Sequence, residues 1–181
     1  MKSLLKFQTP KIIIILASLL VIFFIIFSSE IKFTFIFLAL TIITGILVFF
    51  NYKLKIPLDF TPVFFLSLLL AYSHGFVLAI TFILLGAIVP SILSKEIGVN
   101  YFFMVVIFLF LVSYSPKVLI SLGVIEGGIV LSIVFGFIDM MLDIVFGKHL
   151  SKKFVSFVGF VIVNAFYFIK LSEAILKLLT L

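Results

Sequence analysis

The sequence predicts an all-α protein, a polytopic transmembrane helical bundle of six to seven spans that forms a single integral membrane domain over residues 1–181. Hydrophobic residues make up 65% of the chain and charged residues 11%, too few polar side chains to cover a water-exposed surface. The chain also contains several apolar stretches whose lengths are close to the requirement for a transmembrane helix, which is about 20 residues. Helices are expected because strands in lipid would need barrel-like alternation to satisfy their backbone.

The chain divides into apolar segments separated by short polar connections. The expected segments are Ile12–Phe27, Phe33–Phe50, Phe60–Ser73, Phe76–Leu93, Tyr101–Leu122, Gly127–Phe146 and Phe154–Ile169. The first is expected to be retained, because no small-x-small cleavage site follows it. Residues Lys170–Leu181 would extend the last helix or lie at the interface as an amphipathic helix.

The third segment, Phe60–Ser73, is the shortest, and Pro57 and Pro62 flank its start. The segment either spans the membrane or pairs with the fourth segment as a re-entrant hairpin. Non-helical backbone at membrane depth is tolerated only where protein buries it or where it lines a wet cavity. A re-entrant third segment would therefore place a site beside it.

The lysines predict the orientation. Nine of them lie before the first segment and in the second, fourth and sixth connections, whereas the other connections and the tail hold fewer. Cytoplasmic loops carry the excess of Lys and Arg. We therefore expect a multi-pass protein of the cell membrane with a cytoplasmic N-terminus and, for seven spans, an external C-terminus.

The composition narrows the chemistry. The chain has no Cys and only two His, so thiolate catalysis and metal sites built from Cys or His are not expected. The net charge of +6 comes from lysines clustered at span ends, which favours membrane lipids and not nucleic acid as partners. Neither a cofactor nor a metal is expected, and no residue is assigned a catalytic role.

Asp139 and Asp143 are the strongest candidates for a site. They lie four residues apart and so share one face of the sixth helix. Ionisable residues inside a span are costly and usually functional, and this pair could bind a cation, share a proton or hold an amine. Alternatively, Asp143 could reach the interface or pair with Lys148, His149 or Lys152.

Three further residues are candidate ligand-binding groups, and each also has a structural interpretation. Asn164, in the middle of the seventh segment, could contact a solute or form an interhelical hydrogen bond. Glu126 could act at the outer face or as an acidic residue at a helix start. His74 could contact a substrate or be a turn residue. Asp59 would cap a helix or line a cavity.

The stretch from Lys55 to Leu93 carries a resemblance. Its Pro-Leu-Asp-Phe-Thr-Pro entry, short span, Tyr-Ser-His-Gly turn and following span with Gly86 resemble the S components of energy-coupling-factor transporters and the related MreD-type membrane proteins. Those families usually have about six helices, and the Ala-x-x-x-Ala coupling pattern is missing from the first span. S components imply capture of a small-molecule solute and partnership with a coupling membrane subunit and ATPases.

The sequence leaves three hypotheses open. The first is an S-component-like protein that binds a small solute in an outward-facing cavity, for uptake driven by a separate energising module. The second is a non-catalytic membrane scaffold of MreD type. The third is a lipid-modifying enzyme, because Gly136, Asp139 and Asp143 resemble half of the CDP-alcohol phosphotransferase motif, but the other half and all Arg are absent. We expect no enzyme.

Overall fold

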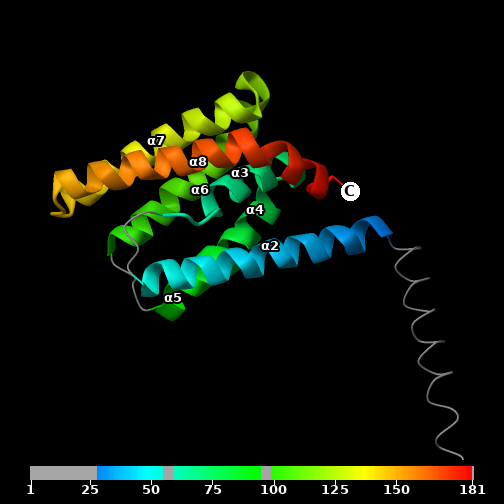
Figure 1. The fold of residues 1–181 in the computed structure, drawn as a ribbon, viewed down its shortest axis with the longest axis horizontal. Coiled ribbons are helices and arrows are strands. Elements are labelled where there is room, and N and C mark those ends of the chain that lie inside the picture. Colours follow the sequence, from blue (N-terminus) through cyan, green and yellow to red (C-terminus); the bar gives the residue numbers. More distant parts are fainter. Residues whose placement is uncertain (1–27, 55–58, 95–98, 181) are drawn as a thin grey trace, which may run out of the picture.

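The computed structural model describes residues 28–54, 59–94 and 99–180, and all its regular elements there are helices (Figure 1). The elements in chain order are α2 Ser28–Lys53, α3 Val63–His74, α4 Phe76–Ile83, the π-helix η1 Leu84–Ile88, α5 Val89–Ser94, α6 Val99–Leu122, α7 Val124–Val145 and α8 Leu150–Leu179. The all-helical prediction is confirmed for these residues.

Five helices in the described residues are long and apolar enough to cross a membrane. They are Ile31–Lys53, Phe76–Ser94, Asn100–Leu122, Val124–Val145 and Leu150–Leu179. The predicted count of six to seven spans is therefore not confirmed. The first predicted segment, Ile12–Phe27, lies outside the described residues. The predicted tail helix is continuous with α8, which reaches Leu179.

Helix α3 occupies the position of the predicted third span. It has 12 residues and is too short to be a candidate membrane span. Eight consecutive residues, from Phe64 to Ala71, are buried. A helix that is apolar on every side must be covered on every side. Accordingly α3 packs against α4, α6, α7 and α8 and forms the centre of the core.

A non-helical entry brings the chain into this core. Residues 59–61 are not helical, and the carbonyl oxygen of Phe60 accepts a hydrogen bond of 2.7 Å from the Tyr167 hydroxyl. Tyr167 lies past the middle of α8, so the entry contacts α8 along its length and not at its end. An unpaired carbonyl group there would be costly. The tyrosine thus allows an extended segment at membrane depth.

A tight turn reverses the chain after α3. Gly75 has φ +89°, a conformation that side-chain-bearing residues rarely adopt, and its N–H donates to the Ala71 carbonyl oxygen. The chain then returns through α4, η1 and α5. In Figure 1, α3 and α4 lie in the middle of the bundle, between α2 and the pair α7 and α8. The turn lies at the end of the bundle opposite Ser94, and Phe76–Ser94 is long enough to cross a membrane, so the re-entrant alternative for the third segment stays a prediction.

One end of the bundle collects the cationic connections. Here α2 ends at Lys53, α5 ends, α6 begins, α7 ends, and α8 begins close to Lys152 and Lys153. We call this the lysine-rich end. The opposite end holds the start of α2, the Gly75 turn and the α6–α7 turn. The ring of His74 stacks there on Phe33, with centroids 4.2 Å apart.

Small residues allow α7 and α8 to pack closely. A Cβ atom built on Gly128 would clash with the ring of Phe168, whose side chain is fully buried. At Gly136 a Cβ atom would lie 2.9 Å from the Phe157 ring. Such contacts replace the hydrophobic driving force that lipid does not supply between helices.

We predict that Gly128→Ala lowers the melting temperature in detergent. The added methyl group meets a packed ring, and overpacking typically costs about 1–3 kcal/mol, more than the about 1 kcal/mol that Ala gains in a helix. Gly86→Ala is the matched control, because its Cβ atom would find its nearest neighbours at 3.5 Å or more. Equal melting temperatures for the two variants would contradict the packing described here.

The topology predicts which positions share a side of the membrane. Since the chain has no native Cys, single cysteines can be introduced at Ser94, Ser121, Ser151 and Thr180. Ser94 and Ser151 lie at the lysine-rich end, and Ser121 and Thr180 at the opposite end. An impermeant thiol reagent should label one pair and spare the other. Labelling of Ser94 without Ser151 would refute the antiparallel order of α6 and α7.

Candidate functional site

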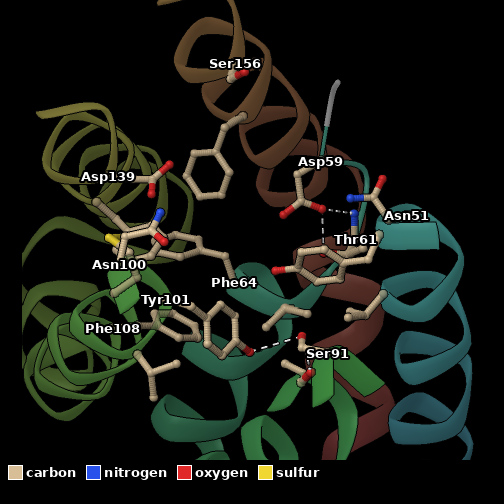
Figure 2. A pocket seen from close by; sticks show the side chains of 18 of the residues that line it. Asn51, Asp59, Thr61, Phe64, Ser91, Asn100, Tyr101, Phe108, Asp139 and Ser156 are labelled. Atoms are coloured by element: carbon tan, nitrogen blue, oxygen red, sulfur yellow. Dashed lines mark hydrogen bonds between the residues drawn. The ribbon is translucent and has the colours of Figure 1, made fainter. Parts of the chain in front are cut away.

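A cavity of about 470 Å³ lies between the helices at the lysine-rich end (Figure 2). Side chains from all the described helices, from the entry to α3 and from the α7–α8 connection line it. The polar lining residues are Asn51, Tyr52, Asp59, Thr61, Ser91, Asn100, Tyr101, Asp139, Asp143, Lys148, Lys153 and Ser156. A cavity of this size, with a few convergent polar groups on an apolar framework, is typical of a small-molecule site.

Four phenylalanines form the apolar part of the cavity wall. The ring of Phe64, from α3, lies 5.7 Å from Phe108, 5.3 Å from Phe135 and 5.3 Å from Phe160, measured between centroids. All four line the cavity. They come from α3, α6, α7 and α8, so the buried helix α3 brings them together. We call this group the phenylalanine cluster.

Asp143 is the centre of a polar network. Its side chain is buried, and Oδ1 accepts a hydrogen bond of 2.7 Å from Asn100 Nδ2. Lys148 Nζ lies 2.6 Å from the same oxygen, and Lys153 forms an ion pair with Oδ2. The predicted pairing with Lys148 is present. His149 and Lys152 are not among the ion-pair partners of Asp143 in the described residues. Asp143 therefore ties the starts of α6 and α8 to the end of α7.

Asp139 lies one turn deeper in α7 and is differently placed. In Figure 2 its carboxylate points into the cavity. Within residues 28–54, 59–94 and 99–180 it forms neither a hydrogen bond nor an ion pair, although Lys148 and Lys153 attract it from a greater distance. A half-buried carboxylate without a partner is costly. Asp139 is thus the unsatisfied charge in the cavity wall.

Asp59 enters the cavity from the opposite side, on the non-helical entry to α3 (Figure 2). Its Oδ1 accepts hydrogen bonds from the Thr61 backbone N–H, at 2.9 Å, and from the Thr61 hydroxyl, at 2.6 Å. Asp59 borders the open cavity and is accessible there. Of the two roles that the sequence analysis considered, the cavity-lining one is observed.

Hydroxyl and amide groups complete the polar lining. The Tyr101 hydroxyl donates to Ser91 Oγ at 3.1 Å, which links α6 to α5, and the Ser91 hydroxyl donates to the Ala87 carbonyl oxygen. Tyr52 and Asn51, from the last turn of α2, line the same cavity. These groups provide hydrogen-bonding capacity beside the carboxylates. No group of three or more acidic or histidine side chains suited to a metal ion occurs in the described parts of the chain.

The five predicted site residues are not brought together. Asp139 and Asp143 line the cavity. Asn164 is buried in α8 and donates from Nδ2 to the Phe160 carbonyl oxygen, while its Oδ1 has no partner among the described residues. Glu126, in the first turn of α7, and His74 lie at the opposite end of the bundle. The observed cavity lies at the lysine-rich end, and the side of the membrane that it faces depends on the orientation predicted from the lysines.

Sequence reasoning did not select several residues of the cavity. Asn100, Tyr101 and Ser91 are neutral polar residues near predicted span ends, where such residues are common. Their position at span ends was an available signal. Every second connection of a helical bundle lies on the same side of the membrane, so polar residues at those span ends can meet. Asn51, Tyr52 and Asp59 share that side with the lysines.

We predict opposite stability effects for the two aspartates. Asp143→Asn removes the charge that two lysines and Asn100 contact, and we expect a loss of about 1.5–3 kcal/mol, the usual value of charged hydrogen bonds. Asp139→Asn removes an unpaired charge and should leave the melting temperature unchanged or raise it. Thermal unfolding in detergent checks both variants. A larger loss for Asp139→Asn would refute the assignment of the network to Asp143.

Comparison with known proteins gives no relative from which a role could be transferred. No protein-family model matches the chain, and no curated protein or solved structure matches it significantly.

Proposed function

We propose that this chain is a small integral membrane protein, S-component-like in its role, that binds a small solute in the cavity at its lysine-rich end. The cavity carries this proposal. It is large enough for one metabolite-sized molecule, it combines an aromatic wall with convergent polar groups, and an unpaired carboxylate points into it. A protein that acted only through helix contacts would have no need of such a space.

The entry to α3 supports the same proposal. Membrane proteins that bind solutes often place broken helices at the site, because unwound backbone is tolerated only beside a cavity or within protein. Residues 59–61 are unwound, and Asp59 and Thr61 line the cavity. This interruption therefore coincides with the cavity.

The lysine distribution supports a plasma-membrane orientation in which the N-terminus and the lysine-rich end are cytoplasmic. The cavity then exchanges solute with the cytoplasm in the described conformation. In an uptake process, this is the end at which the solute is delivered. We propose that a separate coupling membrane subunit and ATPases supply the energy.

We predict that filling the cavity abolishes solute binding. Val105 lines the cavity, and its neighbour Val106 is 50% exposed on the outer surface of the same helix. Val105→Phe should remove ligand-dependent thermal stabilisation, whereas Val106→Phe, the matched control, should preserve it. The measurement is the melting shift in detergent across a library of water-soluble metabolites, together with mass spectrometry of co-purified molecules. No shift with any solute, and no co-purified molecule, would contradict the proposal.

The orientation is tested on the same single-cysteine proteins. Cysteines at Ser94 and Ser151 should be protected from an impermeant thiol reagent in intact cells and become labelled after permeabilisation. Labelling of Ser151 in intact cells would place the cavity at the outer face instead.

A further inference from the structure

We infer that the solute is a small ammonium compound, a protonated amine attached to an apolar body. The inference rests on the proposed function and names its ligand class. Asp139 and Asp59 would bind the ammonium group, and the phenylalanine cluster would cover the apolar body.

The charges of the lining are the first argument. Three aspartates and two lysines line the cavity, which gives a formal charge of 2 − 3 = −1 when all are ionised. Both lysines form ion pairs with Asp143. With Asp143 they form a network of net charge +1. Asp139 and Asp59 have no cationic partner within ion-pair distance in the described residues, and their two charges bring the lining to −1. The lining therefore has an unbalanced negative charge, which a cationic ligand would compensate.

The placement of the two carboxylates is the second argument. Asp139 projects from α7 and Asp59 from the entry to α3, on opposite sides of the space shown in Figure 2. An ammonium group has several N–H donors and no acceptor, so it can be held by carboxylates together with tyrosine and amide oxygens. Tyr101, Tyr52 and Asn51 supply such oxygens in the same lining.

The phenylalanine cluster is the third argument. Aromatic faces attract ammonium groups through the ring quadrupole, and they cover hydrocarbon equally well. Phe64 is buried and in ring contact with Phe108, Phe135 and Phe160, so the cluster is a fixed surface. A wholly polar cation, strongly hydrated, would gain little from this wall. An amine with an apolar body uses both parts of the cavity.

Other charged ligands fit less well. An anion would meet two carboxylates without a cationic partner in the described residues, and the lysines that could attract it, Lys148 and Lys153, already contact Asp143. A divalent metal ion prefers several clustered oxygen ligands, and the described residues contain no group of three or more acidic or histidine side chains that could hold one.

Three probes with matched bodies test the ligand class. They are 2-phenylethylamine, the neutral 2-phenylethanol and the anionic 3-phenylpropanoate. Binding is measured by isothermal titration to the full chain in lipid nanodiscs, for wild type, Asp139→Asn and Asp59→Asn. Glu173→Gln is the control for charge, because Glu173 is exposed and pairs with Lys177 in α8, away from the cavity. Melting temperatures without probe verify that each variant is folded.

We expect the amine to bind wild type and Glu173→Gln at least tenfold more tightly than the alcohol. Asp139→Asn should remove most of that difference, and Asp59→Asn, which alters no helix, should reduce it independently. Tightest binding of the anion, no binding of the amine, or equal amine affinity in wild type and both aspartate variants would overturn the inference.

The failure of this inference differs from the failure of the proposed function. If the alcohol or the anion binds and Val105→Phe abolishes that binding, the cavity is a solute site and only the ligand class is wrong. If none of the three probes binds and the metabolite library gives no melting shift, the proposed function fails as well.

Discussion

The burial of α3 is the constraint on which the rest of the structure depends. A 12-residue helix that is apolar on every side cannot face water, and it is too short to cross the hydrocarbon core alone. It is stable only when longer helices surround it. The chain must then reach the middle of the bundle without a helix, and the entry at residues 59–61 does this. The cavity lies beside that entry, so the space and the short helix have the same origin.

The polar groups at the lysine-rich end divide into a satisfied set and an unsatisfied set. Asp143 has three partners from three segments of the chain, which explains how a carboxylate can be 3% exposed in a membrane protein. Asp139, one turn away on the same face, has none of these contacts. The two residues look alike in the sequence, and only their surroundings give one a structural role and leave the other available.

The sequence predicted the features that depend on local patterns. Apolar length predicted the long helices, and the prolines at 57 and 62 indicated an irregular third segment. Pairing with Lys148, five residues away, was one of the alternatives for Asp143. The contacts that build the site are long-range. Asn100 lies 43 residues from Asp143, and Tyr167 lies 107 residues from Phe60. With neutral polar partners, such pairings leave no periodic or charge pattern to detect. Helical spacing was enough to select Asp139. The composition did not indicate the phenylalanine cluster, because lipid-facing helices also contain many Phe residues.

The position of α3 in the chain has a consequence for biogenesis. The helices that cover it, α6, α7 and α8, are all synthesised after it. During translation α3 therefore leaves the ribosome before its binding partners exist, and it is too short to settle as an independent transmembrane segment. Its final location must be reached late, when α8 supplies Tyr167 to the Phe60 carbonyl group and Phe168 to the core. Completion of the cavity is then the last step of assembly, and a chain arrested before α8 would present an uncovered apolar helix to the insertion machinery.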